Sequence, residues 1–287
     1  MIITGHEETL RDATLPTHLM QPSEVWGERW NANPNPLARR WMETVVDKQS
    51  MVVLAADRYT MAGLTELLED VSPHVAALKT HVDLVEDWTA ESWNVFCEKA
   101  KDADMLIFED RKHGDIGKIA RDQMGGVYDS RSWADLMTAH LISGPSVLDG
   151  MAEGWSNVGR HGGVLLLAQM SSAGNLLEIP GYTDAVVEAG KEHPACFGFI
   201  GNGSRANELA ELRKKVGEVK MIWTPGVNLV TGDAELGQRY GDPTEAVLAG
   251  SDGIIVGSGI HRSDNPTEAA KSYADVSWNA LLQRSGL

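Results

Sequence analysis

This 287-residue chain is poor in cysteine, and it has neither long apolar runs nor an excess of basic residues. The two cysteines, Cys97 and Cys196, lie far apart without metal-ligand spacing, so we expect buried thiols and no disulfide framework. No apolar run approaches the roughly 20 residues that span a membrane. A secretory signal has a basic segment followed by an apolar core, and the N-terminus of this sequence lacks that pattern. We therefore expect a cytoplasmic protein with no membrane partner.

The shortage of basic residues limits the partners of the chain. Forty-one acidic residues face 25 basic ones, which leaves a net charge of −16. This charge argues against binding to nucleic acid in bulk. A small anionic substrate would need a local basic pocket. With 43% hydrophobic and 23% charged residues, the composition is that of an ordinary globular protein able to bury a sizeable core.

Short apolar runs alternate with amphipathic stretches of helical length from residue 51 onward. Such a rhythm predicts a parallel sheet, and eight units fit a closed (β/α)₈ TIM barrel over residues 36–287. The competing fold, an open doubly wound sheet, needs a Gly-rich turn after its first strand, and residues 55–59 supply none. Residues 1–35 predict an N-terminal arm that packs through Trp26 and Trp30. The expected strands are Met51–Ala56, Val75–Leu78, Met105–Phe108, Leu136–Ile142, Val164–Ala168, Ala195–Ile200, Lys220–Trp223 and Gly253–Val256.

The most informative stretch follows the third expected strand, where five formal charges fall within residues 109–115. Asp110, Lys112 and Asp115 form D-x-K-x-x-D, and strand alternation places the first two on one face. Lys112 among acids stays protonated and can act as a general acid. Two carboxylates beside a substrate carboxylate would repel it, and its departure as carbon dioxide relieves that repulsion. The alternative is a solvated loop with surface ion pairs.

Barrel enzymes carry their function at the carboxyl ends of the strands. The charged residues expected at that rim are Asp57, Lys79, Asp110, Lys112 and Asp115. The last two strands are followed by Gly-containing loops, and loops in this position often bind phosphate. This convergence favours a catalytic site over the surface ion pairs.

The ordered motifs resemble the orotidine 5′-monophosphate decarboxylase family, and in particular its longer, eukaryote-type branch. The resemblance covers most of residues 35–260. The matching stretches are NPLARR (35–40), LKTHVD (78–83), IFEDRKHGDIG (107–117), MSS (170–172), EHP (192–194), FGFI (197–200), TPGV (224–227) and LGQRY (236–240).

This resemblance implies a decarboxylation that uses no cofactor and no metal. By the match, Asp110 faces the substrate carboxylate and Lys112 protonates C6 of the pyrimidine as carbon dioxide leaves. Lys79 anchors the charge network and a ribose hydroxyl, and Asp115 comes from the neighbouring subunit of a homodimer. The substrate-binding residues implied are Asp57 at the ribose, Ser171 at the pyrimidine, and Gln238 and Tyr240 at the phosphate, with Pro225, Gly257 and Ser258 beside them.

The chain departs from the family at the phosphate end. Ser258 stands where the family has an arginine paired to the phosphate, and a serine offers one neutral donor in place of a bidentate cation. Arg262 and Arg239 are candidates to replace it. Ile119 stands where the family usually has a threonine.

Three other functions are compatible with the sequence. The same chemistry could serve an orotidine-like nucleoside or another pyrimidine carboxylate, which Ser258 and Ile119 motivate. The chain could be a non-catalytic nucleotide-binding protein, although a retained charge network argues against it. A metal-dependent sugar-phosphate decarboxylase is the weakest alternative.

Overall fold

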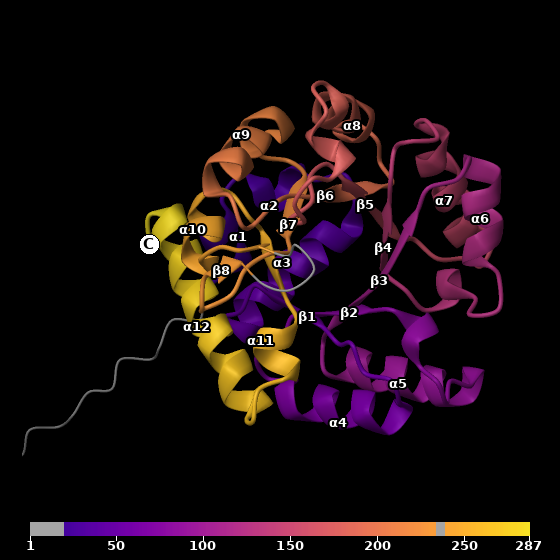
Figure 1. The fold of residues 1–287 in the computed structure, drawn as a ribbon, viewed down its shortest axis with the longest axis horizontal. Coiled ribbons are helices and arrows are strands. Elements are labelled where there is room, and N and C mark those ends of the chain that lie inside the picture. Colours follow the sequence, from indigo (N-terminus) through magenta and orange to yellow (C-terminus); the bar gives the residue numbers. More distant parts are fainter. Residues whose placement is uncertain (1–19, 234–238) are drawn as a thin grey trace, which may run out of the picture.

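Eight parallel strands close into a barrel with the helices outside it (Figure 1). The computed structural model describes residues 20–233 and 239–287. The strand order around the ring is β1-β10-β7-β6-β5-β4-β3-β2, which confirms the predicted (β/α)₈ barrel. The barrel strands are β1 (Val52–Ala55), β2 (Ala77–Thr80), β3 (Leu106–His113), β4 (Leu136–Ala139), β5 (Gly163–Leu167), β6 (Cys196–Ile200), β7 (Met221–Thr224) and β10 (Gly253–Val256). A separate antiparallel ribbon pairs β8 (Gly232–Asp233) with β9 (Arg239–Tyr240).

Side-chain caps fix where several of the outer helices begin. Thr60 accepts a hydrogen bond from the Gly63 amide, and Thr89 accepts one from the Ser92 amide, so each satisfies an N–H group that the first turn leaves open. Among the described residues, no helix is both long and apolar enough to cross a membrane. The helices are α4 (Met61–Val71), α5 (Ala90–Asp102), α6 (Gly117–Met124), α7 (Ser146–Ser156), α8 (Tyr182–Gly190), α9 (Ala206–Val216), α10 (Pro243–Leu248), α11 (Ser258–His261) and α12 (Pro266–Ser285).

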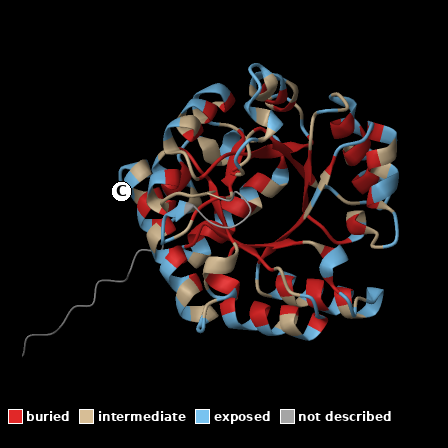
Figure 2. Cartoon of the chain, in the orientation of Figure 1, coloured by how far each residue is buried: buried red, intermediate tan, exposed pale blue. Residues whose placement is uncertain are grey.

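The core fills the inside of the barrel and the layer between strands and helices (Figure 2). Most strands are apolar and buried on both faces, as parallel strands covered by helices require. Helix α3 (Pro36–Lys48) covers the amino-terminal opening of the barrel. Its Trp41 ring lies 4.5 Å from that of Trp223, which also meets Phe108 and Phe197 edge-on.

Three strand predictions are wrong at their carboxyl ends. The second strand was expected to end at Leu78, but β2 continues to Thr80, so Lys79 lies within the strand and not after it. The third strand was expected to end at Phe108, but β3 continues to His113 because its charged half still pairs with β4, after a shift of register between Glu109 and His113. The fourth strand was expected to reach Ile142, but β4 ends at Ala139, and Ile142 is exposed.

The described part of the predicted arm packs onto the barrel. Residues 20–35 contain two short helices, α1 (Pro22–Trp26) and α2 (Arg29–Ala32). Trp26 is buried and donates its indole N–H to the Met42 carbonyl, and the Arg39 guanidinium lies 4.8 Å from the Trp30 ring. The packing of both tryptophans is therefore as expected. Residues 1–19 lie outside the described part, and the division between arm and domain stays a prediction.

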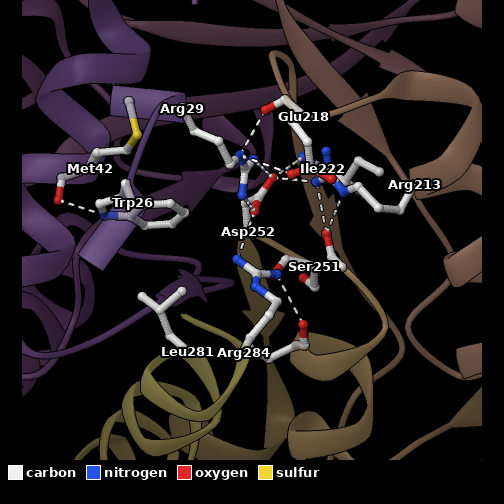
Figure 3. Close-up of polar contacts among 12 residues, drawn as sticks. Trp26, Arg29, Met42, Arg213, Glu218, Ile222, Ser251, Asp252, Leu281 and Arg284 are labelled. Atoms are coloured by element: carbon white, nitrogen blue, oxygen red, sulfur yellow. Dashed lines mark hydrogen bonds and ion pairs between the residues drawn. The ribbon is translucent and has the colours of Figure 1, made fainter. Parts of the chain in front are cut away.

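Asp252 joins the arm to the amino-terminal end of the barrel (Figure 3). The carboxylate, fully buried just before β10, accepts two hydrogen bonds of 2.8 Å from Arg29 on α2. Arg213 of α9 and Arg284 of α12 donate to the same carboxylate, as does the Ile222 amide of β7. Burial alone would raise the pKa of Asp252, but the three guanidinium groups outweigh it and hold this pKa far below its usual range.

Asp252 and its three arginines together carry more positive than negative charge. Backbone carbonyls accept hydrogen bonds from guanidinium N–H groups that Asp252 does not bind. Arg213 also donates to three carbonyls, those of Gly217, Lys220 and Gly250. Burial lowers the pKa of Arg284 to about 10, although Asp252 opposes the shift. Because Asp252 is the only buried carboxylate among the described residues that these three arginines share, its loss leaves Arg213 and Arg284 unpaired and Arg29 with the exposed Glu218 alone.

We expect Asp252→Ala to lower the free energy of unfolding by about 3–5 kcal/mol, the usual cost of breaking a buried charge network from one side. Urea denaturation followed by circular dichroism measures this change. Asp275→Ala is the matched control, because Asp275 forms only an exposed ion pair with Lys271, and it should leave the midpoint unchanged. Equal midpoints for the two variants would contradict the structural role given to Asp252.

Candidate active site

Lys79, Asp110 and Lys112 meet at the carboxyl ends of two neighbouring strands. Lys79 belongs to β2, and the other two belong to β3. The Asp110 Oδ2 atom lies 2.7 Å from Lys112 Nζ and 3.5 Å from Lys79 Nζ. The side chains of Lys79 and Asp110 are about one-tenth exposed, and that of Lys112 is 36% exposed. The buried Asp110 carboxylate therefore lies between two ammonium groups, and that of Lys79 is almost fully shielded from solvent.

Thr138 on β4 orients this array. Its hydroxyl donates to Asp110 Oδ1 at 2.8 Å and accepts the Lys112 backbone N–H at 2.9 Å. One side chain thus fixes both the carboxylate and the backbone of the neighbouring cation. The sequence analysis missed Thr138. The sequence feature that could have indicated it is a single hydroxyl-bearing residue within a strand that is otherwise apolar and buried.

The backbone at Lys112 has an unusual conformation. Its φ is +52°, in the left-handed region, where a non-glycine residue costs about 1–3 kcal/mol. This residue falls within the register shift between β3 and β4. The strain is held by the Thr138 hydrogen bond and by the ion pair with Asp110, so the Lys112 ammonium is placed by the fold and not by a freely moving loop.

His81 and Asp57 extend the array toward β1. The His81 Nδ1 atom lies 3.0 Å from Asp57 Oδ1, and its Nε2 atom lies 3.5 Å from Asp110 Oδ2. Lys79 Nζ also reaches Asp57, at 3.8 Å. His81, which belongs to the stretch LKTHVD (78–83), therefore lies between the two carboxylates.

The array keeps both of its carboxylates ionised. Burial alone would raise the pKa of Asp110, but Lys79, His81 and Lys112 together hold this pKa well below its usual value. For Asp57, the contacts with His81 and Lys79 likewise outweigh burial and lower the pKa to about 2. Hydrogen bonds to the two carboxylates raise the pKa of His81.

Two further charges of the predicted cluster lie outside the array. Arg111 forms an ion pair of 2.8 Å with Asp83 at the surface. Glu109 is buried and accepts hydrogen bonds from the Thr80 hydroxyl and the Val82 amide, and burial raises its pKa to about 7. A surface ion pair therefore accounts for Arg111, whereas the ion pair between Asp110 and Lys112 belongs to the partly buried array.

A cavity of about 200 Å³ opens above the array, large enough for a small ring. Its walls combine polar side chains on one side with apolar strand residues. Of the predicted binding residues, Ser171 and Pro225 line it. The lining consists of Lys79, Phe108, Asp110, Lys112, Thr138, Leu167, Met170, Ser171, Ser172, Ile200, Pro225 and Ile255.

Three other predicted binding residues, Gly257, Ser258 and Tyr240, are not part of this lining. Gly257 and Ser258 follow β10, where α11 begins, and Tyr240 is half-buried in β9. Gln238 lies outside the described residues. Ile119, the second departure, is half-buried in α6.

Asp115 does not join the array within one chain. Its side chain is exposed, and its Oδ1 atom accepts the Ile116 amide at 2.7 Å. Together with Lys112 and His113 it lines a second cavity, of about 590 Å³, beside the first. Three large apolar side chains near this end of the barrel are exposed, namely those of Ile116, Val127 and Ile142.

The described part of the chain has neither a cluster of metal-ligating side chains nor an exposed cysteine thiol. Residues 20–233 and 239–287 contain no group of three or more His, Cys, Asp or Glu side chains arranged to hold a metal. Cys97 and Cys196 are free and buried, as predicted, and burial raises the pKa of each thiol to about 12.

Comparison with protein families and curated proteins gives a single answer. The model of the orotidine 5′-phosphate decarboxylase / HUMPS family matches residues 50–273. The chain is 36% identical to the orotidine 5′-phosphate decarboxylase of Rhizomucor pusillus, over 92% of this chain and 98% of that protein. It is 38% identical to the enzyme of that name from Phycomyces blakesleeanus, over 93% and 97%. With the uridine 5′-monophosphate synthase of Bos taurus it shares 37% identity, over 94% of this chain and 55% of that protein.

Solved structures agree with the fold. The orotidine 5′-phosphate decarboxylase of Pyrococcus horikoshii OT3 superposes with a TM-score of 0.62 at 26% identity, over 79% of this chain and 99% of that one. The orotidine 5′-monophosphate decarboxylase of Methanocaldococcus jannaschii, solved with the inhibitor BMP, gives the same score at 22% identity, over 79% and 98%. At this identity the second likeness supports the fold alone.

Proposed function

The chain belongs to the orotidine 5′-phosphate decarboxylase family, and from this premise we propose that it converts orotidine 5′-monophosphate to UMP and carbon dioxide. The observation that carries the proposal is the Lys79–Asp110–Lys112 array, which lies against a cavity of ring size. A carboxylate fixed between two ammonium groups suits a reaction that expels one carboxylate and supplies one proton.

The chemistry assigns one task to each end of the array. The substrate carboxylate lies against Asp110, whose ionised state makes that position unfavourable for a second negative charge. The bond from C6 to the carboxyl carbon breaks, carbon dioxide leaves, and the electron pair stays on C6. Lys112 Nζ gives a proton to C6, and water then restores the ammonium group. One substrate and one proton thus yield UMP and carbon dioxide.

Preorganisation is the source of catalysis in this proposal. Lys112 is fixed by its ion pair with Asp110 and by the Thr138 contact with its backbone. A charge that is already in place needs no reorganisation when carbanion character develops at C6, and the low exposure of Asp110 strengthens its interactions. No metal or cofactor takes part in the proposed steps.

The substrate-binding roles follow the order of the residues around the barrel mouth. Asp57 and Lys79 contact the ribose hydroxyls, and Ser171 and Pro225 face the pyrimidine ring from the other side of the cavity. Gln238, Tyr240, Gly257 and Ser258 belong to the phosphate end. The cytoplasmic location expected from the sequence stays a prediction.

Replacement of Lys112 tests the proposed reaction. We expect Lys112→Ala to reduce turnover of orotidine 5′-monophosphate by about 10²–10⁴-fold or more, because the proton donor is lost. An ultraviolet assay of pyrimidine absorbance measures turnover, and a thermal melt shows that the variant is folded. Lys271→Ala, at an exposed helix position, is the matched control and should keep full activity. Full activity of the Lys112 variant would refute the assigned role.

We further propose a homodimer in which Asp115 completes the array of the partner subunit. Three observations support it: the Asp115 side chain is exposed, it lines a cavity together with Lys112, and exposed apolar side chains lie at Ile116 and Val127. An isologous interface would cover these apolar groups and bring a second carboxylate to each site.

Mixing two inactive variants tests the shared site. Lys112→Ala and Asp115→Ala should each be inactive alone. A heterodimer of the two contains one site with both residues native, so random mixing should restore about a quarter of wild-type activity. Gel filtration of each variant checks that dimers form. If the mixture stays inactive while heterodimers are present, Asp115 acts within its own chain. Full activity of Asp115→Ala alone would show that Asp115 takes no part.

A further inference from the structure

The phosphate end of the proposed substrate needs a cation that the motif position does not supply. A monophosphate carries close to two negative charges, and the chain has a net charge of −16. Barrel enzymes often bind phosphate at the loops after their last two strands. Here the loop after β10 offers the neutral Ser258. A compensating cation should therefore lie near this loop, have a side chain that the fold holds in place, and have no carboxylate of its own.

Neither arginine named from the sequence meets this requirement. The Arg239 guanidinium is directed at the β5 loop, where it donates to the Ser171 carbonyl at 3.2 Å and the Ser172 carbonyl at 3.4 Å. It also lies 3.5 Å from the Glu178 carboxylate. Arg262 is exposed, and within residues 20–233 and 239–287 no hydrogen bond or ion pair holds its side chain.

Arg58 does meet the requirement. It follows Asp57 at the end of β1, the strand that pairs with β10, and its side chain is half-buried. Within residues 20–233 and 239–287, no carboxylate lies within ion-pair distance of its guanidinium, and its one side-chain hydrogen bond joins Nη1 to His261 Nδ1 at 3.3 Å. A half-buried arginine without a carboxylate is uncommon in so acidic a chain, and it leaves most of its N–H groups available.

His261 sets the direction of Arg58. Its ring is buried and lies against Gly257, where a Cβ atom would be 3.8 Å from His261 Nε2 and 3.6 Å from the Ala55 Cβ. Ile255 lines the catalytic cavity, and Gly257, two residues further on, faces the same side. The imidazole therefore lies at the mouth of the barrel, between the ends of β1 and β10.

The tautomer of His261 follows from this contact. Arginine stays protonated and can only donate, so Nδ1 must accept and the ring proton is on Nε2. Burial lowers the pKa of His261, and the neighbouring Arg58 adds to the shift, which favours this neutral form. The Nε2–H group is then a second donor, on the side of Gly257.

We propose that Arg58, held in place by His261, makes the cationic contact with the substrate phosphate that Ser258 cannot make. This inference depends on the proposed function, because it assigns the 5′-phosphate of that same substrate. It also completes an order of charges around the mouth, in which Lys112, Asp110, Lys79, Asp57 and Arg58 alternate in sign. The pyrimidine lies at the Lys112 end and the phosphate at the Arg58 end.

The test compares ligands with and without the phosphate. Isothermal titration gives the affinities of the wild-type chain for UMP and for uridine. We expect Arg58→Ala to weaken UMP binding by about tenfold or more, because a charge-assisted contact is lost, and to leave uridine binding unchanged. His261→Phe keeps an aromatic ring but removes the Nδ1 acceptor. It should lower the ratio of UMP affinity to uridine affinity, but by less than Arg58→Ala does. Arg262→Ala is the matched control and should change neither affinity.

A rescue experiment separates recognition from folding. The double variant Arg58→Ala/Ser258→Arg has an arginine at the position where the family has one. In it the ratio of UMP affinity to uridine affinity should recover toward the wild-type value. Equal weakening of UMP and uridine by Arg58→Ala, or no weakening of UMP, would overturn this inference. A wild-type chain that binds UMP with phosphate-dependent affinity but never turns over orotidine 5′-monophosphate would instead overturn the proposed function.

Discussion

The ion pair between Asp110 and Lys112 is the interaction on which the proposed site depends. A buried carboxylate is tolerable only with partners, and Asp110 has Lys79, Lys112, His81 and the Thr138 hydroxyl. These groups lie on, or directly after, three neighbouring strands, so the site forms only when β2, β3 and β4 are paired. The left-handed backbone at Lys112 is a further sign that the fold holds a conformation that the residue alone would not adopt.

The two ends of the barrel use buried aspartates in different ways. At the amino-terminal end, Asp252 is surrounded by three arginines and a backbone amide, and its carboxylate is fully buried. At the carboxyl end, Asp110 has a comparable set of partners, but Lys112 remains partly exposed beside a cavity. The first arrangement stabilises the joint between arm and barrel, and the second leaves a cation available for chemistry. This division agrees with the usual separation of stability and function between the two faces of such barrels.

The sequence was sufficient for the fold and for the centre of the site. The alternation of apolar runs and amphipathic stretches predicted the closed barrel, and the D-x-K-x-x-D spacing identified Asp110 and Lys112. Thr138, His81 and Arg58 could not be assigned, because their roles depend on contacts between strands that are distant in sequence. The extent of β3 was also missed, since the register shift that lets a charged segment continue as a strand leaves no pattern along the chain.

The most direct test of the account is the reaction of orotidine 5′-monophosphate with the wild-type chain in deuterated buffer that contains EDTA, followed by nuclear magnetic resonance. The account predicts one equivalent of carbon dioxide for each UMP, and deuterium at C6 of the product, because the exchangeable ammonium group of Lys112 supplies that position. Unchanged substrate under these conditions, or UMP formed only when a metal is restored, would contradict the claim that the Asp110-centred array performs the decarboxylation.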